Sequence, residues 1–228
     1  MKTVIVIPTY NEKDNIQPLV EEIFKVATGV GIFIVDDNST DGTGIIADEL
    51  SKKYARFKVL HREKKEGLGS AYIAGFKEVL KMNPDYILQM DADFSHHPKY
   101  IPLFLKEIPN CNIVLGSRFL NSKGMPVNVS LFSILANHYV KWILGLKITD
   151  SLGGFKCFQR KVIEGIDLDS FISKGFIFQA EFLYRAMAKG FLIHEIPIIF
   201  YPRKSGHSKK TKSIILEALL KTILFKGN

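Results

Sequence analysis

Short apolar runs alternate with amphipathic stretches along the first half of the chain. Runs rich in β-branched residues predict strands at residues 3–7, 31–35, 58–61, 86–90 and 113–117. Apolar residues at helical spacing between these runs predict helices at about residues 15–26, 42–53, 67–82 and 98–108. We expect Asp14 or Asn15 to cap the first helix, and Asp41 with Gly42 to open the second. Strands and helices that alternate in this way favour an α/β fold with a mainly parallel sheet.

The second half of the chain has a different pattern. A long apolar helix is expected at residues 130–146, and another helix at 178–189 with Gly190 as its stop. Residues 202–212 are basic and rich in turn formers, which predicts a surface loop. Residues 213–225 return to an apolar helical pattern. The two apolar helices are compatible with packing on the core and with lying on a membrane.

Length and composition fit one domain with a single core. The chain has 228 residues, of which 46% are hydrophobic, and one domain can bury a core of that size. Cys111 and Cys157 are its only cysteines, with no CxxC pair, so neither a disulfide framework nor a zinc site is supported. A reducing, cytoplasmic setting fits this usage. Because the sequence has no signal-peptide core and no apolar segment of about 18 residues, we expect a soluble or peripheral protein.

The net charge of +8 is unevenly distributed. Residues 1–109 carry 14 Lys/Arg against 16 Asp/Glu, whereas residues 110–228 carry 17 against 7. The basic second half is expected to meet phosphates, nucleic acid or a membrane surface, or else to be a solvated lysine-rich surface. The single Trp142 and the lack of aromatic residues interleaved with basic ones argue against nucleic acid as a partner.

Polar residues follow four of the predicted strands at the point where each strand ends. The four segments are Pro8-Thr9-Tyr10-Asn11-Glu12, Asp36-Asp37-Asn38-Ser39, Asp91-Ala92-Asp93-Phe94-Ser95 and Gly116-Ser117-Arg118. Ligands of α/β sheets bind beyond the carboxyl ends of the strands. All four segments open on the same edge of the predicted sheet, so we expect a binding site there.

Asp91 and Asp93 are candidates for a metal site. Because they are two residues apart, their carboxylates point the same way in an extended segment. Oxygen ligands of this kind select Mg²⁺ or Mn²⁺, and substrate phosphates would complete the shell. The alternative is a pair of loop carboxylates that cap the helix near Pro98. Asp36 and Asp37 likewise fit either the caps of a strand-to-helix turn or ligands of a nucleotide base or ribose.

Seven motifs, in order along almost the whole chain, resemble one family. They are PTYNE, VDDNSTDGT, EGLGSAYIAGF, MDADFSHHP, GSR, TDSLGGFKCF and RKSGHSK. Together they resemble the polyprenyl-phosphate sugar synthases of glycosyltransferase family 2, above all dolichol-phosphate mannose synthase. The resemblance implies a Rossmann-like GT-A catalytic domain over residues 1–201, with a mainly parallel sheet. It also implies a basic acceptor loop and a C-terminal amphipathic helix over residues 202–228.

The resemblance implies roles for individual residues as well. Guanosine would be bound by Pro8, Tyr10, Glu12, Val35 and Asp37. The diphosphate and the metal would be bound by Asp91, Ala92 and Asp93. Ser95 stands where some members have a Gln that helps to ligate the metal, and Gln179 and Glu181 resemble sugar-side residues. Arg118, Arg203 and Lys209 would be the phosphate-binding cations, so that catalysis would depend on Asp93 and these three residues. Asp150 matches a motif without an assigned role.

The activity implied is metal-dependent, inverting transfer of mannose from GDP-mannose to dolichyl or polyprenyl phosphate. The residue chemistry agrees, because a phosphomonoester is already anionic at neutral pH. Such an acceptor needs cations that hold it in line rather than a strong base. One alternative is a UDP-sugar donor, with glucose or N-acetylglucosamine passed to a polyprenyl phosphate or a glycan hydroxyl. A non-catalytic nucleotide- or membrane-binding module is another.

The resemblance further implies a peripheral position on the cytosolic face of a membrane. The chain would be held there by amphipathic helices or by small membrane-anchoring subunits, and the helices at 130–146 and 213–225 are the candidates. The region after Gly153-Gly154 is unusually aromatic. Five residues there fit either the core or an apolar groove for a prenyl chain: Phe155, Phe158, Phe171, Phe176 and Phe178.

Overall fold

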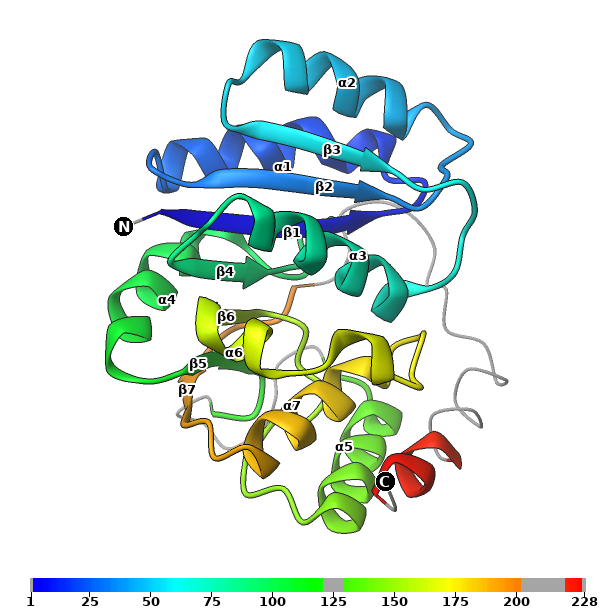
Figure 1. The fold of residues 1–228 in the computed structure, drawn as a ribbon, viewed down its shortest axis with the longest axis vertical. Helices are drawn as coiled ribbons and strands as arrows, with labels where there is room; N and C mark the ends of the chain where they lie inside the picture. Colours follow the sequence, from blue (N-terminus) through cyan, green and yellow to red (C-terminus); the bar gives the residue numbers. More distant parts are fainter. Residues whose placement is uncertain (1, 121–128, 202–219, 227–228) are drawn as a thin grey trace.

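A mainly parallel sheet runs through the centre of the molecule in this computed structural model, which describes residues 2–120, 129–201 and 220–226. Within these residues the sheet has seven strands in the order β3-β2-β1-β4-β6-β5-β7 (Figure 1). The strands are β1 (Thr3–Thr9), β2 (Gly31–Asp36), β3 (Phe57–His61), β4 (Tyr86–Gln89), β5 (Ile113–Ser117), β6 (Lys156–Gln159) and β7 (Ile193–Pro197). Strand β6 runs antiparallel to both of its neighbours, and the other pairings are parallel.

Helices cover both faces of the sheet (Figure 1). The α-helices are α1 (Lys13–Val26), α2 (Thr43–Lys53), α3 (Leu68–Lys81), α4 (Ile101–Glu107), α5 (Leu131–Leu144), α6 (Arg160–Gly165) and α7 (Phe178–Ala188). Short 3-10 turns are η1 (Pro98–Tyr100), η2 (Ile108–Asn110) and η3 (Leu168–Ser170). Helices α1, α2 and α4 pack on one face of the sheet, and α3, α6 and α7 pack on the other. A third apolar cluster joins α5 to α7 and to Phe225 of the helical residues 220–226.

The α/β fold and the five strands predicted from sequence are confirmed, with ends within two residues of those expected. The helices predicted up to residue 189 are also present, although the one at 98–108 is divided into η1, α4 and the start of η2. Residues 220–226 are helical, and the rest of the helix expected at 213–225 lies outside the described residues. Strands β6 and β7 and helix α6 were not predicted. Lys156 and Gln159 in β6, and His194 and Glu195 in β7, interrupt the apolar runs by which the other strands are recognised.

One predicted helix cap is wrong and the other is confirmed. Helix α1 begins after Glu12, and Asn15 lies inside the helix, where its amide donates to the Glu12 carboxylate at 2.8 Å. Asp14 lies in the first turn and is not the cap. At the start of α2, by contrast, Asp41 accepts hydrogen bonds from the backbone N–H and the hydroxyl of Thr43 at 3.0 and 2.6 Å. The polar loops that follow β1 and β2 are therefore held by their own side chains.

Helix α5 has two different faces. Its ends are well defined, because Ser130 accepts from the Ser133 N–H at 3.2 Å and Gly145 ends the helix with φ at 65°, a left-handed conformation that favours glycine. The inner face, with Val140 and Leu144, is buried against α7. The outer face leaves Trp142 79% exposed. Packing on the core is thus confirmed for one face of this helix, and contact of the other face with a membrane stays a prediction.

Candidate active site

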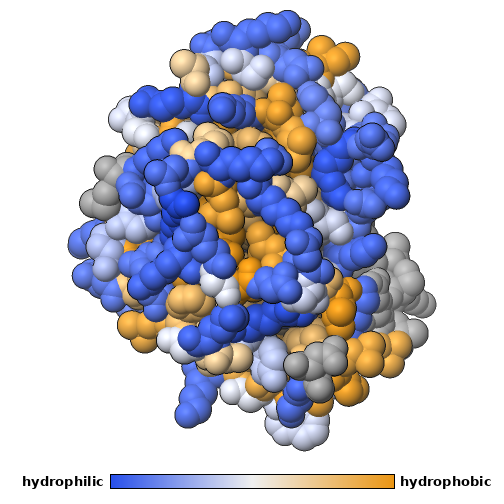
Figure 2. Space-filling model, viewed as in Figure 1, coloured by the Kyte–Doolittle hydropathy of each residue, from blue (hydrophilic) through white to orange (hydrophobic). Residues whose placement is uncertain are grey.

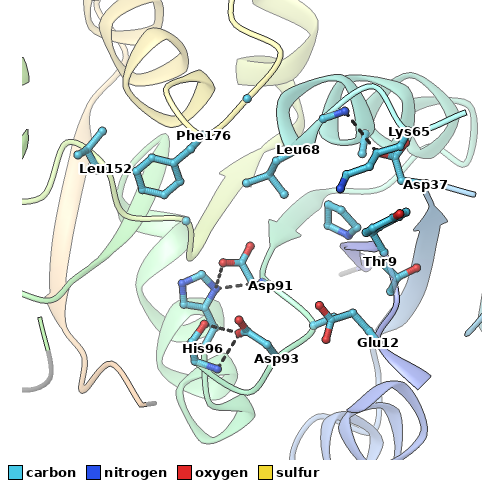
Figure 3. A pocket seen from close by; sticks show the side chains of 18 of the residues that line it. Thr9, Glu12, Asp37, Lys65, Leu68, Asp91, Asp93, His96, Leu152 and Phe176 are labelled. Atoms are coloured by element: carbon cyan, nitrogen blue, oxygen red, sulfur yellow. Dashed lines mark hydrogen bonds and ion pairs between the residues drawn. The ribbon is translucent and has the colours of Figure 1, made fainter. Parts of the chain in front are cut away.

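A cavity of about 280 Å³ opens at the carboxyl ends of the parallel strands β1, β2 and β4 (Figure 3). This is the edge of the sheet at which the sequence predicts a site. The cavity is lined by Pro8, Tyr10, Glu12, Asp37, Asp91, Ala92, Asp93, Ser95 and Arg118, which were all proposed from sequence. Arg203 and Lys209 lie outside the described residues. The fold therefore brings together residues that are more than a hundred positions apart in the chain.

Two residues proposed to bind the nucleotide sugar do not line the cavity. Val35 is fully buried in β2 beneath α3, where a Cβ on Gly75 would lie only 2.9 Å from its Cγ2 atom. Gln179 is 1% exposed, and its Oε1 accepts hydrogen bonds from Gln89 Nε2 at 2.6 Å and from Lys156 Nζ. Both side chains are thus part of the packing below the site. The resemblance implies contact with the ligand, whereas the structure places these two side chains outside the lining of the cavity.

The loop after β4 holds its two carboxylates in place through its own polar groups. Asp93 is 4% exposed, and it accepts from the hydroxyl and the backbone N–H of Ser95 at 2.5 and 3.0 Å. Asp91 accepts from the hydroxyl of Tyr72 in α3 at 3.1 Å, with 32% of its own side chain exposed. Burial, together with the neighbouring Asp91 charge, raises the pKa of Tyr72 well above its ordinary value, so Tyr72 stays a hydrogen-bond donor. In this arrangement Ser95 orients Asp93.

His96 closes the same loop from below. Its Nδ1 accepts the backbone N–H of Asp91 at 3.0 Å, and its ring stacks on Phe155 with the centroids 5.1 Å apart. Burial lowers the pKa of His96, although the nearby Asp91 and Asp93 charges act in the opposite direction. Burial therefore favours the neutral imidazole. Phe155, Phe158 and Phe178 are fully buried, which confirms the core interpretation for them, whereas Phe176 lines the cavity.

Asp37 lies at the opposite end of the cavity from Leu152 and Phe176 (Figure 3). Its carboxylate accepts from Arg62 at 2.5 Å and from the backbone N–H groups of Glu66 and Gly67 at 3.3 Å. Burial raises the pKa of Asp37, and the Arg62 charge only partly offsets this effect. Nearby, the Lys65 ammonium lies 3.7 Å from the centre of the Tyr10 ring. This end of the cavity therefore combines an aromatic face, a cation and a hydrogen-bonded carboxylate.

Arg118 reaches the cavity from the end of β5 and is held by a buried partner. Its Nε and Nη2 atoms donate to the two oxygens of Asp150 at 2.7 Å each, and its backbone N–H donates to the same carboxylate at 3.1 Å. Asp150 is completely buried. Burial opposes the charge on Arg118, but the Asp150 charge overcomes this effect and raises the pKa of Arg118. Glu195 supports the arrangement, because its carboxylate accepts from the backbone N–H groups of Thr149 and Asp150 at 2.8 and 3.2 Å.

A second buried cation, Lys156, lies in β6. Its side chain is completely buried and its ammonium donates to Gln179 Oε1. Burial lowers the pKa of Lys156 to about 7, against the opposing effect of the Asp150 and Asp91 charges. Lys156 is thus poised between its charged and neutral forms near neutral pH. It does not line the cavity, so its influence on a bound ligand would be electrostatic.

Glu181, which resembled a sugar-side residue, is bound by other groups of the protein. It is completely buried, and it accepts from the backbone N–H of Ser173 at 3.0 Å and from Arg185 Nη2 at 2.6 Å. The segment that it holds leads to Gly175 and Phe176, which line the cavity. Glu181 therefore fixes one wall of the site from outside.

The acidic pair is the part of the site that could hold a divalent cation. Within residues 2–120, 129–201 and 220–226, no group of three or more His, Cys, Asp or Glu side chains could hold a metal by itself. Asp91 and Asp93 both line the cavity, however. Magnesium is commonly bound by one or two carboxylates together with substrate phosphates. The donor set therefore fits a cation that arrives with, or is completed by, a diphosphate.

Several residues in or behind the site were not proposed from sequence, among them Lys65, Tyr72, His96 and Lys156. His96 directly follows the acidic loop, and Lys65 precedes a glycine-rich helix start, so both lie inside or beside motifs that the sequence displays. Tyr72 and Lys156 also lie inside quoted motifs, EGLGSAYIAGF and TDSLGGFKCF. Their places behind the cavity follow from the packing of α3 and the pairing of β6, which the sequence pattern does not give.

A mainly parallel sheet with an acidic pair and a cavity at its carboxyl edge is the arrangement expected of a GT-A glycosyltransferase. Residues 4–167 match the model of the family described as glycosyl transferase family 2, and the chain belongs to this family. It is 38% identical to a polyprenol monophosphomannose synthase of Mycolicibacterium smegmatis, over 96% of this chain and 85% of the relative. It is also 35% identical to an undecaprenyl-phosphate mannosyltransferase of Micrococcus luteus, over 96% of this chain and 92% of the relative. The protein is therefore a glycosyltransferase, as the motifs indicated.

Solved structures agree with the fold. Glucosyl-3-phosphoglycerate synthase from Mycobacterium tuberculosis, in a complex with Mn²⁺, uridine diphosphate and phosphoglyceric acid, superimposes with a TM-score of 0.73. The match covers 99% of this chain and 78% of that one at 16% identity. Residues 1–349 of TarS from S. aureus give a TM-score of 0.63 at 19% identity, with 99% and 65% covered. At these identities the likeness concerns the fold alone.

Proposed function

We propose that this chain transfers mannose from GDP-mannose to a polyprenyl phosphate, with inversion at the anomeric carbon. One observation carries the proposal: two relatives that are similar over 96% of the chain are both named for mannose and for a polyprenol or undecaprenyl phosphate. Guanosine as the nucleoside is supported by the resemblance of the PTYNE and VDDNSTDGT motifs. The geometry of the cavity supports each part of the reaction in turn.

The nucleotide would occupy the end of the cavity formed by the first two strand loops. Tyr10 offers an aromatic face for a base, and the Asp37 carboxylate lies where it could accept from a base or a ribose hydroxyl. Lys65 adds a positive charge beside Tyr10. Because a nucleoside diphosphate is both aromatic and anionic, this combination suits its base and its charge together.

The diphosphate would lie next to Asp91 and Asp93, and these two carboxylates would hold Mg²⁺ or Mn²⁺. Such a cation supplies charge stabilisation of the departing diphosphate. The protein orients the two carboxylates through hydrogen bonds that the Ser95 hydroxyl donates to Asp93 and the Tyr72 hydroxyl donates to Asp91. Both hydrogen bonds come from side chains of the protein itself, and they fix the orientation of the two carboxylates.

The acceptor phosphate would enter on the side of Arg118. The bidentate bond to Asp150 fixes the plane of the guanidinium, and the group keeps further N–H donors for an anion. On this side the cavity is also lined by Leu152, Phe176 and Phe200, whose apolar side chains suit the first part of a prenyl chain. A phosphate oxygen that approaches opposite the diphosphate would attack the anomeric carbon in line. This geometry gives inversion.

A membrane would deliver such an acceptor. No helix in the described part of the chain has the length and apolar content needed to span a bilayer. Instead, hydrophobic residues gather at the lower right in Figure 2, over α5 and the helical residues 220–226. The large exposed apolar side chains of these two helices are Leu131, Phe132, Leu135, Trp142, Leu220, Ile223 and Leu224. We assign this apolar surface to peripheral contact with the cytosolic face of a membrane.

Sugar transfer by the purified chain tests the proposal. Radiolabelled GDP-mannose, UDP-glucose and UDP-N-acetylglucosamine would each be offered with dolichyl or undecaprenyl phosphate and Mn²⁺. We expect label in the lipid from GDP-mannose alone, and loss of transfer with EDTA and in Asp93→Asn. The matched control is Asp169→Asn, because Asp169 is an 80% exposed carboxylate that does not line the cavity. Transfer from a UDP-sugar instead would contradict the proposed donor.

A further inference from the structure

The loop that carries the acidic pair turns back on itself immediately after the second carboxylate. Phe94 has a positive φ of 63°, a conformation that a residue of its size rarely adopts. The turn brings the side chain of His96 under the start of the loop, where Nδ1 lies 3.0 Å from the backbone nitrogen of Asp91. Two hydrogen bonds within the loop therefore hold its shape. The Ser95 hydroxyl donates to the Asp93 carboxylate, and the Asp91 N–H donates to His96.

The direction of this hydrogen bond fixes the form of the imidazole. A backbone N–H can only donate, so Nδ1 of His96 must be the acceptor and cannot carry a proton. The neutral ring then carries its proton on Nε2. This tautomer is a definite chemical property of the site, and it can be measured without any ligand.

The surroundings of His96 leave its ring little freedom. It is 3% exposed, it stacks on Phe155, and Phe200 meets it edge-on with the centroids 6.0 Å apart. A Cβ added to Gly154 would lie 2.9 Å from the Cε1 atom of the ring. Because the ring is confined on these sides, Nδ1 is a fixed acceptor and the Asp91 N–H is held at one position.

We propose that His96 is a positioning residue, which accepts the Asp91 N–H through Nδ1 and so sets the orientation of the acidic pair for a cation and a diphosphate. This inference rests on the proposed function, since it assigns the acidic pair to a metal-bound diphosphate. The role of His96 differs from that of Asp91 and Asp93, because His96 would act through the backbone of Asp91 and not as a ligand of the cation.

Two substitutions separate the hydrogen bond from the packing of the ring. His96→Asn and His96→Gln both remove the aromatic ring, but only Asn keeps an acceptor atom bonded to Cγ, as Nδ1 is. We expect His96→Gln to weaken binding of Mn²⁺ and GDP roughly tenfold, the size expected when a supporting hydrogen bond is lost. His96→Asn should recover most of this loss. The matched control is His97→Gln, since His97 Nδ1 accepts the Lys99 N–H at 3.2 Å outside the cavity.

The binding of Mn²⁺ with GDP would be measured by titration calorimetry, and transfer kinetics should show the loss mainly in the KM for the sugar nucleotide. Imidazole ¹⁵N spectra of the ligand-free protein and hydrogen exchange of the Asp91 amide give readouts independent of activity. We expect a proton on Nε2 of His96, and faster exchange at Asp91 in His96→Gln than in His96→Asn. A proton on Nδ1, or equal effects of the two substitutions, would overturn the inference. If the unsubstituted protein bound neither Mn²⁺ with GDP nor any sugar nucleotide, the proposed function would fail, and the role assigned to His96 with it.

Discussion

Removal of the Asp150 charge should destabilise the fold, because it leaves Arg118 buried without its counter-ion. In the structure Arg118 is 6% exposed and Asp150 is completely buried, and two hydrogen bonds of 2.7 Å join them. Asp150→Asn keeps the shape of the side chain and removes its charge. The guanidinium would then keep its own charge in the interior, with the loss of the interaction that raises its pKa.

Loss of one partner of a buried ion pair typically costs about 3–5 kcal/mol of unfolding free energy. Because the amide of Asn still offers one acceptor, we expect the lower end, about 3 kcal/mol. In a domain of this length that corresponds to a fall in Tm of roughly 6–12 °C. The exposed pair of Lys77 and Asp169 is the comparison. Asp169→Asn should change the unfolding free energy by less than about 1 kcal/mol.

Urea unfolding of a double-mutant cycle separates the charge effect from lost packing. Arg118→Met combined with Asp150→Asn leaves no unpaired charge, so the double variant should be more stable than Asp150→Asn alone. Sugar transfer should stay low in the double variant, because we propose that Arg118 binds the acceptor phosphate. The reasoning would be refuted if Asp150→Asn unfolded within about 0.5 kcal/mol of the unsubstituted protein, or if Arg118→Met made it less stable still.

Three further predictions follow from the site and the surface. The first concerns the difference in unfolding free energy between the protein and its Lys156→Met variant. This difference should rise by roughly 1.4 kcal/mol per pH unit between about pH 7 and 10.5, because the unfolded state binds the Lys156 proton there and the folded state does not. Urea unfolding at several pH values checks this, and a difference that does not change with pH would contradict the effect of burial. Lys65→Ala should weaken GDP binding about fivefold in calorimetry, through loss of the cation beside Tyr10, and unchanged affinity would remove Lys65 from the nucleotide site. Trp142→Gln should reduce sedimentation with anionic liposomes, whereas Ile45→Gln, at a 67% exposed position in α2, should not; equal binding of both variants would exclude the apolar surface as the contact.

The strand-end residues of the site could be predicted because they follow strands of simple apolar pattern. In a parallel sheet the carboxyl ends meet at one edge, so the positions of Tyr10, Asp37 and Asp91 in the sequence are enough to place them together. The metal-binding interpretation of the acidic pair depends on a spacing of two residues and on a position directly after a strand, and it stays a prediction. These conclusions need no knowledge of how the distant elements pack.

The partners of the buried charges could not be predicted. Asp150 and Arg118 are 32 positions apart, and only the antiparallel insertion of β6 between β4 and β5 brings Lys156 beside Gln179. Strand β6 begins with the charged Lys156, and a pattern of apolar residues does not predict a buried strand at such a position. A polar residue in the middle of a sheet becomes favourable only when its partners are present, and the partners come from elements whose positions the sequence pattern does not contain.

The anomeric configuration of the product tests the central claim most directly. The purified protein would be incubated with GDP-mannose, undecaprenyl phosphate and Mn²⁺, and the extracted lipid would be examined by ¹³C–¹H coupling at the anomeric carbon. Because the mannose of GDP-mannose is α-linked and the attack is in line, the account predicts a β-linked mannosyl phosphate. An α-linked product, or the absence of any mannosyl lipid while GDP-mannose binds, would contradict it.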